Sequence, residues 1–234
     1  MVIDFHSHIL PGIDDGSASL EESIALLRME AEQGVRHVVA TPHFYARYDS
    51  PDRFLEKRRR AEEALRSEME KHEGLPEITV GAEVYFFRGM SESDFLPRLT
   101  IGGENCVLIE MPHGPWKEDA CRELTAIWEN RRILPIIAHI DRYIRPFRTH
   151  GIPKLLERLP VFVQANADFF LERSTASMAL KMLKADQIQL LGSDCHNLED
   201  RKPNLEAAVK LIRRKLGDRA LDAVMEYERK VLGR

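Results

Sequence analysis

Histidine and carboxylate side chains follow most of the short apolar runs in this 234-residue chain. The segment "FHSHILPGIDDG" places two histidines two residues apart and then adds a pair of aspartates. Side chains two apart on a strand point to the same side. Imidazole and carboxylate groups are also common ligands of divalent transition metals. The segment therefore predicts part of a metal site just after a first strand.

Further candidate ligands occur where later apolar runs end. The nine candidates are His6, His8, Asp15, His43, Glu83, Glu110, His139, Asp194 and His196. Any one of them alone is more often a solvated or satisfied core residue. Together, without a cation, they would leave like charges buried side by side, which is costly. Four carboxylates and five imidazoles suit two or three divalent ions, with manganese, iron or zinc favoured over calcium. Such centres commonly hydrolyse phosphoesters, because they clamp phosphoryl oxygens and lower the pKa of a water.

Seven apolar runs read as strands, interleaved with helical patterns. The runs are "VIDF", "HVVATPH", "ITVGAEVY", "CVLIEMP", "ILPIIAH", "VFVQANA" and "IQLLGSD", and the helical segments are 19–34, 51–73, 119–131, 151–158, 174–186, 204–216 and 218–231. Mostly flat apolar runs are typical of parallel sheets buried on both faces, and the alternation favours an α/β fold, either a closed barrel or a doubly wound sheet. In a barrel, the carboxyl ends of the strands form the face that carries active sites. No linker divides the chain, so a single domain over residues 1–234 is expected.

Two local signals refine this prediction. Ser19 and Glu22 have capping-box spacing at the start of the first helix, and Gly34 suits its C-terminal end. The piece "FFRGMSESD" after the third strand is irregular and predicts no long helix.

Composition excludes several classes of protein. Apolar residues make up 44% of the chain and charged residues 31%, a globular balance, and the net charge of −4 gives no reason to expect nucleic-acid binding. No apolar stretch is long enough for a membrane span, and no secretion signal is recognisable. Three cysteines without a CxxC pair argue against a disulfide framework. A cytoplasmic protein is expected.

Cys195 and Arg201 have the C-x5-R spacing of cysteine-dependent tyrosine phosphatases. That mechanism needs a loop of backbone N–H groups around the phosphate and a thiol of lowered pKa. The intervening residues include Glu199 and Asp200 and no glycine, so the loop would repel an anion. The Cys195 side chain should also point away from those of its neighbours Asp194 and His196. The match is interpreted as chance.

The other histidines and the basic run have simple structural explanations. His37, His72, His113 and His150 fall in strand starts, a helix end or loops. The run Lys57–Arg60 alternates with glutamates on an amphipathic helix, which predicts a solvated face.

The motifs "DFHSHILPGIDDG", "ATPHF", "GAEVY", "LIEMP", "IIAHIDRY", "VQANA" and "LGSDCHN" resemble those of the polymerase-and-histidinol-phosphatase (PHP) superfamily. Within it, the chain is most similar to the bacterial manganese-dependent protein tyrosine phosphatases of the CpsB/YwqE group, found in capsule and exopolysaccharide operons. The resemblance runs over residues 1–203 in order and spacing. It implies a distorted (β/α)7 TIM-like barrel with parallel strands and outer helices. It also implies hydrolysis of phosphotyrosine monoesters through a metal-activated water or hydroxide.

The resemblance also implies roles for single residues. The first metal position would be held by His6, His8, Glu83 and Asp194, the second by Glu83, Glu110 and His139, and the third by Asp15, His43 and His196. Asp14 would be structural. Arg142 matches a substrate-binding, transition-state arginine. Arg201 matches a second arginine at the phosphate, although "RKP" stands here where the family often has "RPP".

Three functions are compatible with these features. A tyrosine phosphatase would act on a phosphotyrosine protein, typically the tail of a cognate bacterial tyrosine kinase. Another PHP phosphatase, acting on histidinol phosphate, a nucleotide or a sugar phosphate, would keep every ligand and change only the loops, but histidinol-type chains tend to be longer. A catalytically silent metal-binding regulatory domain would be expected to lack ligands, and none of the nine is missing. The tyrosine phosphatase is therefore favoured.

Overall fold

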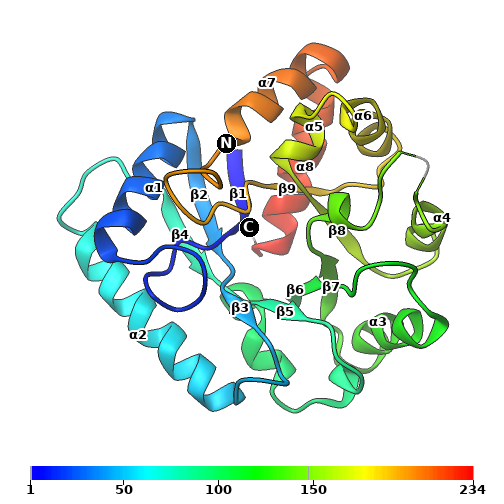
Figure 1. Ribbon diagram of the computed structural model, residues 1–234, viewed down its shortest axis with the longest axis horizontal. Coiled ribbons are helices and arrows are strands. Elements are labelled where there is room, and N and C mark those ends of the chain that lie inside the picture. The colour runs from blue at the N-terminus through cyan, green and yellow to red at the C-terminus, as the bar shows by residue number, and fades with distance from the viewer. Residues whose placement is uncertain (1, 147, 234) are drawn as a thin grey trace.

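The computed structural model describes residues 2–146 and 148–233, where helices surround a set of parallel strands (Figure 1). The strands are β1 Val2–Ser7, β2 Val35–Ala40, β3 His43–Phe44, β4 Glu77–Val80, β5 Glu83–Tyr85, β6 Cys106–Glu110, β7 Leu134–Ile137, β8 Phe162–Asn166 and β9 Leu190–Gly192. The α-helices are α1 Leu20–Glu32, α2 Pro51–Met69, α3 Glu118–Arg131, α4 Ile152–Leu156, α5 Ala167–Leu171, α6 Ala176–Lys184, α7 Leu205–Leu216 and α8 Asp218–Val231. Short 3-10 helices are η1 Met90–Glu92, η2 Leu96–Leu99, η3 Ile101–Gly103 and η4 Ile140–Arg142.

The strands follow one another around a distorted barrel. One sheet has the order β1-β2-β4 and the other the order β3-β5-β6-β7-β8-β9, and all of these pairs are parallel. A parallel bridge between Ser7 and Cys195 brings the region after β9 back beside β1, where the His8 N–H donates to the Cys195 carbonyl at 2.9 Å. This return to the first strand favours the barrel over the doubly wound sheet and confirms the predicted α/β fold with parallel strands.

Two of the seven predicted strands are each divided by a kink. Pro42 separates β2 from β3, and Gly81 separates β4 from β5. The ladder continues across both breaks, because the Gly81 N–H donates to the Ala40 carbonyl at 2.9 Å and the Glu83 N–H to the Pro42 carbonyl at 3.0 Å. A Cβ on residue 81 would lie 2.8 Å from the Ile101 side chain, so only glycine allows this close approach. The nine short strands thus occupy seven positions in the barrel.

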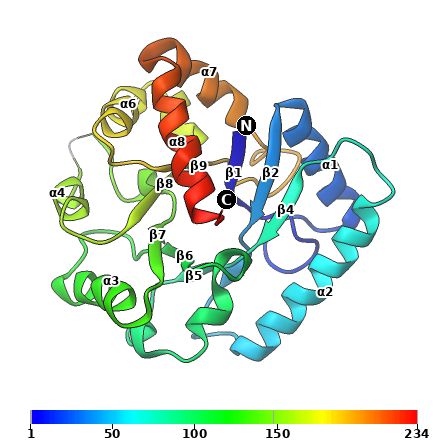
Figure 2. The same ribbon diagram turned by 180° about the vertical axis from the view of Figure 1, so that it is seen from behind.

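Two apolar cores hold the barrel in shape. The larger core contains apolar side chains from the strands and from the helices packed outside them. The smaller one combines strand residues such as Ile3, Phe5 and Leu108 with Val231 and Leu232 at the end of α8, and it takes no side chain from α1 to α7 within the described residues. It is therefore the barrel interior, and α8 closes the amino-terminal end. Figure 2 shows α8 lying across that end.

The helix predictions are confirmed within a few residues, with some differences. The Ser19 hydroxyl accepts from the Glu22 N–H as predicted, but the Glu22 carboxylate reaches the Ala18 N–H rather than that of Ser19. The first helix ends beside Gly34, which has a φ of 81°. Helix α2 stops at Met69, short of the expected residue 73, and α5 is an additional helix that the sequence did not predict. The irregular piece after the third strand is confirmed and leads into 3-10 turns.

The basic run on α2 is largely a solvated face, as predicted. Arg59 and Arg60 are exposed and pair with Glu56, and Arg59 also pairs with Glu63. Arg58 differs, because its half-buried guanidinium donates to the Gly81 and Arg98 carbonyls. None of the helices within 2–146 and 148–233 is long and apolar enough to cross a membrane.

Candidate metal and phosphate site

All nine candidate ligands lie at or just beyond the carboxyl ends of the barrel strands. The kinks leave His43 at the start of β3 and Glu83 at the start of β5, still beyond the ends of β2 and β4. The remaining candidates follow β1, β6, β7 and β9 or lie at their ends. We call this set the mouth cluster: His6, His8, Asp15, His43, Glu83, Glu110, His139, Asp194 and His196.

Glu83 lies in the middle of the cluster. Its Oε2 is 3.2 Å from His6 Nε2 and 3.0 Å from His43 Nδ1, while its Oε1 is 2.6 Å from His139 Nε2. Burial acts to raise the pKa of Glu83, but the imidazole of His6 and a hydrogen bond from His139 hold it well below its usual range. The carboxylate is therefore ionised and surrounded by imidazoles from three strand positions of the barrel.

Four of the five imidazole rings can be held in place by a hydrogen bond at Nδ1. The Nδ1 atoms of His6, His8, His139 and His196 have acceptors within reach: Gln164 Oε1 at 3.1 Å, Asp14 Oδ2 at 2.8 Å, Tyr143 Oη at 3.3 Å and the Asp194 carbonyl at 2.9 Å. A ring that donates from Nδ1 presents the lone pair of Nε2 to the cluster. This is the usual arrangement of metal-binding histidines.

His6 and His8 face the same point, as their spacing predicts. Their Nε2 atoms are 3.2 Å apart, and Asp194 Oδ1 lies 3.6 Å from the first and 3.5 Å from the second. Burial acts to raise the pKa of Asp194, but the two imidazoles hold it well below its usual range. Two facing ring nitrogens beside an ionised carboxylate need a proton or a cation between them.

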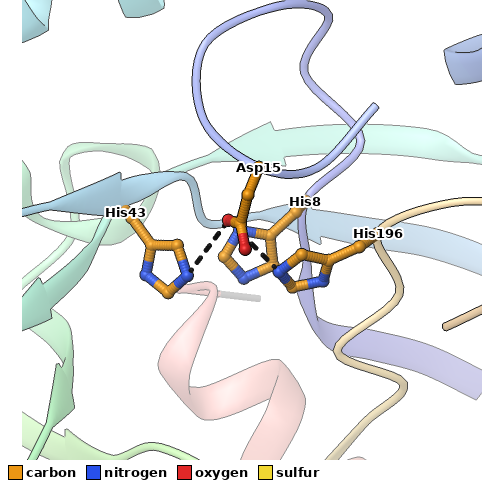
Figure 3. A group of neighbouring side chains, drawn as sticks. All are labelled: His8, Asp15, His43 and His196. Carbon is orange, nitrogen blue, oxygen red and sulfur yellow. Dashed lines mark ion pairs between the residues drawn. The ribbon is translucent and has the colours of Figure 1, made fainter. Parts of the chain in front are cut away.

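Asp15 projects over the mouth from the loop after β1. In Figure 3 its carboxylate lies between His43 and His196, with the His8 ring beside it. Asp15 Oδ1 is 3.5 Å from His43 Nε2 and 3.6 Å from His196 Nε2. The loop depends on Gly16, because a Cβ there would overlap the His8 carbonyl oxygen. The neighbouring Asp14 instead accepts from the backbone N–H groups of Gly16 and His43, which agrees with its interpretation as a structural residue.

The residues fit a bound cation. His196 Nε2 is buried and has no hydrogen-bond partner among the described residues. Burial and the neighbouring His8 lower the pKa of His196 to about 3, so its ring is neutral near pH 7, the form that binds metals. Groups of nearby ligand atoms include His8, Asp15, His43 and His196; His6, His8 and Asp194; and His43, Glu83 and Glu110. These residues are candidate metal ligands.

Two arginines border the cluster. The Arg142 guanidinium donates to Asp194 Oδ2 at 2.6 Å and to Glu110 Oε1 at 3.4 Å. Arg201 donates to the other Asp194 oxygen at 3.0 Å and lies 3.9 Å from Asp15. About a third of each side chain is exposed at the mouth, so both guanidinium groups can meet an incoming anion.

The geometry around Cys195 argues against a thiol mechanism. Cys195 is fully buried, and its Sγ lies 4.0 Å from Glu30 Oε1 on α1, away from the mouth as predicted. Burial and the neighbouring Glu30 raise the pKa of the thiol well above its usual value. A nucleophilic cysteine needs the opposite shift.

The histidines interpreted as structural lie outside the candidate metal groups found among the described residues. His37 is buried in β2 and contacts Thr79, and His72 pairs with Glu68. His113 and His150 are exposed.

The sequence interpretation missed several supporting residues. Gln164 accepts from His6 Nδ1 and from the His139 N–H, and Asn166 donates to Asp194. Both lie on β8, the one strand position without a candidate ligand. Two polar side chains at a spacing of two in an otherwise apolar run were the available signal. Asp4 was also missed, although its carboxylate accepts from the His6 and Ser193 N–H groups.

The fold places the chain among the TIM-barrel-like α/β proteins, and the mouth cluster adds candidate metal ligands at the carboxyl ends of the strands. The family model described as "Capsular polysaccharide synthesis, CpsB/CapC" matches residues 2–232. The chain belongs to this CpsB/CapC family.

Similar proteins agree with the family assignment. The tyrosine-protein phosphatase CpsB of Streptococcus agalactiae is 28% identical over 243 residues, covering 99% of this chain and 98% of that protein. The tyrosine-protein phosphatase YwqE of Bacillus subtilis is 27% identical, covering 92% and 85%. A crystal structure from a study of YwqE from Bacillus subtilis and CpsB from Streptococcus pneumoniae, described as unique metal-dependent tyrosine phosphatases, has a TM-score of 0.84 at 23% identity. It covers 97% of this chain and 93% of the other. At that identity, the structural likeness shows the shared fold.

Proposed function

We propose that this protein is a metal-dependent protein tyrosine phosphatase, a phosphoric monoester hydrolase of one domain over residues 1–234. The observation that carries the proposal is the mouth cluster. Its candidate ligand groups share His8 and His43, and the partly exposed Arg142 and Arg201 lie beside them. Family membership and similarity to proteins named tyrosine-protein phosphatases support the same activity. Residues 1, 147 and 234 of the proposed domain lie outside the described residues.

The proposed ligand sets are those that the family resemblance implies, and in each set every residue lies within 4 Å of another member. His6, His8, Glu83 and Asp194 would hold one ion; Glu83, Glu110 and His139 a second; and Asp15, His43 and His196 a third. Mixed nitrogen and oxygen donors without a thiolate suit Mn²⁺, with iron or zinc as alternatives. When bound, two or three such ions supply Lewis acidity, which polarises a phosphate and lowers the pKa of water.

The protein's own groups would bind and orient the substrate. Arg142 and Arg201 can each offer paired N–H donors to phosphoryl oxygens, and guanidinium groups bind such oxyanions well. They would also stabilise negative charge that develops in the transition state. Gln164, Asn166 and Asp14 hold the ligand side chains in place, so little reorganisation is needed when phosphate binds.

The proposed substrate is a phosphotyrosine-containing protein in the cytoplasm, in particular the tail of a cognate bacterial tyrosine kinase in capsule or exopolysaccharide regulation. Support comes from the family description and from the names of the similar proteins. A phosphotyrosine monoester carries nearly two negative charges. This charge matches a mouth cluster that would hold divalent metal ions and has two arginines beside it.

The test is hydrolysis of a phosphotyrosine peptide by metal-stripped protein, with and without added Mn²⁺. Activity should return with Mn²⁺, be lost in His6→Ala, fall in Arg142→Ala and persist in Cys195→Ser. Chelator-resistant activity that is lost in Cys195→Ser would overturn the metal mechanism.

Two further outcomes separate the alternative functions. Turnover of histidinol phosphate, a nucleotide or a sugar phosphate, but not of the peptide, would indicate another PHP phosphatase. Binding of Mn²⁺ without turnover of any ester would indicate a regulatory domain.

A further inference from the structure

A cavity of about 360 Å³ opens directly beside the mouth cluster, at the turn between β3 and α2. Its lining includes Asp15 and His43, which also belong to the ligand group in Figure 3. Another cavity, of about 260 Å³ beside Phe86 and Trp116, has no candidate ligand in its lining. The first cavity therefore begins where a bound phosphate would lie, and the second does not.

Aromatic side chains form one wall of the first cavity. The Tyr45 ring lies 5.3 Å from the His43 ring and 5.7 Å from that of Tyr85, measured between centroids, and Tyr48 meets Tyr45 edge to face at 6.5 Å. Tyr48 is 75% exposed, twice as much as the exposed side chains of Leu171 and Leu198, each at 37%. The cavity thus presents aromatic surface to solvent.

The turn that carries these rings is held in place. The Tyr48 and Asp49 N–H groups donate to the Tyr45 carbonyl at 2.9 and 3.0 Å. The Asp49 carboxylate accepts from Arg53 Nε at 2.8 Å and so joins the turn to the first part of α2. The exposed ring is therefore presented by a fixed backbone rather than by a loose loop, which lowers the cost of binding a partner ring.

We propose that this cavity is an aryl subsite, in which the ring of phosphotyrosine packs against Tyr45 and Tyr48 while its phosphate is bound at the mouth cluster. The inference rests on the proposed function and gives it a structural basis for selecting tyrosine. Only one bridging oxygen separates the phosphorus from the ring, so the ring must occupy space adjoining the phosphate. Aromatic rings associate favourably in edge-to-face or offset arrangements.

Charge and length explain why the ring, and not another part of the substrate, would enter. The lining sets three carboxylates, Asp14, Asp15 and Asp49, against one guanidinium, Arg53, which pairs with Asp49 at 2.8 Å, so it has no excess of positive charge to draw a phosphate away from the mouth cluster, whereas a neutral ring can enter. Phosphoserine or phosphothreonine has a much shorter side chain. Either would draw its own peptide backbone towards the cavity and leave the two tyrosine rings without an aromatic partner.

The test compares binding of phenylphosphonate and methylphosphonate to Mn²⁺-loaded protein by calorimetry, which needs no turnover. Wild type should bind the phenyl compound about tenfold more tightly. Tyr45→Leu should lose most of that preference without weakening methylphosphonate, Tyr48→Ser should lose part of it, and Tyr45→Phe should keep it. Phe86→Leu, in the cavity without candidate ligands, is the matched control and should also keep it. Thermal unfolding would verify that each variant is folded.

The outcomes separate this inference from the proposed function. Equal affinity for the two phosphonates, no binding of either, or a preference unchanged in Tyr45→Leu would overturn the aryl subsite. Loss of the preference in Phe86→Leu but not in Tyr45→Leu would move the ring to the other cavity and also overturn it. A phenyl preference that depends on Tyr45, in a protein that hydrolyses no phosphotyrosine, would support the subsite and reject the phosphatase function.

Discussion

Two groups of buried acidic side chains lie next to each other in this protein and have opposite electrostatics. In the mouth cluster, Glu83 and Asp194 have pKa values held well below the usual range. In the second group, which we call the acid group and which consists of Asp4, Glu30 and Cys195, burial raises the pKa of every member. All five of these side chains are at most 5% exposed, so burial alone cannot explain the difference.

The neighbours of each group account for the contrast. The mouth carboxylates face imidazoles and the Arg142 guanidinium, whereas Asp4 and Glu30 face each other. Asp4 Oδ2 and Glu30 Oε2 have no donor among the described residues, and a proton held between the two carboxyl groups would satisfy both. Both groups bring potential ligand atoms within 4.8 Å of one another. Proximity of such atoms is therefore a weak criterion for a metal site unless imidazoles that can act as neutral donors accompany the acids.

Glu83→Gln should produce the largest effect, because it removes the charge at the centre of the mouth cluster with little change of shape. We expect activity on a phosphotyrosine peptide to fall about 100- to 1,000-fold, as for loss of a central electrostatic group. Bound Mn²⁺, measured by elemental analysis, should fall as well. Glu30→Gln is the matched substitution in the acid group and should keep most of the activity, because an amide resembles a protonated carboxyl group. Equal losses in the two variants would contradict the distinction between the groups.

Asp4→Ala tests the connection between the groups, since Asp4 Oδ1 accepts from the His6 N–H at 3.1 Å and the Ser193 N–H at 2.9 Å. Each buried donor left without an acceptor should cost about 1–3 kcal/mol in unfolding free energy, measured with urea. Mn²⁺ affinity should fall about 10- to 100-fold, as when a group that orients a ligand is lost. Asp4→Asn keeps an acceptor oxygen and should lose less on both counts. Unchanged Mn²⁺ affinity in Asp4→Ala would show that Asp4 serves folding alone.

The sequence was informative about residues whose chemistry is unusual for their position, and less so about the residues that support them. His6, His8, Asp194 and His196 stand out because charged or imidazole groups at a spacing of two rarely follow a buried strand by chance. Their gathering at one end of the barrel follows from the parallel strand order. Their role as metal ligands is a prediction that metal analysis can test.

Other features depend on contacts between distant parts of the chain. Pro42 interrupts the second predicted strand, but the ladder continues beyond it through the hydrogen bond from the Glu83 N–H to the Pro42 carbonyl, which no local pattern reveals. The need for Gly81 arises from Ile101, twenty residues later. Asp4 looks like one polar residue within the first strand, and its partner Glu30 looks like an ordinary glutamate on an amphipathic helix.

Glu30→Gln should also change how stability depends on pH, and this is the smallest expected effect. A carboxyl group with a raised pKa keeps its proton in the folded protein but loses it on unfolding above about pH 4.5, the ordinary value for glutamate. Its contribution to stability is therefore complete below pH 4.5 and is lost as the pH rises through the folded pKa, by at most about 1.4 kcal/mol per pH unit. Glutamine has no such proton, so the unfolding free energy of Glu30→Gln minus that of wild type should increase from pH 5 to pH 8.

Glu73→Gln, at an exposed glutamate, should show no such trend. Urea unfolding at several pH values would measure both differences. A constant difference for Glu30→Gln would mean that Glu30 is ionised in the folded protein, and that the two acidic groups are more alike than their surroundings indicate.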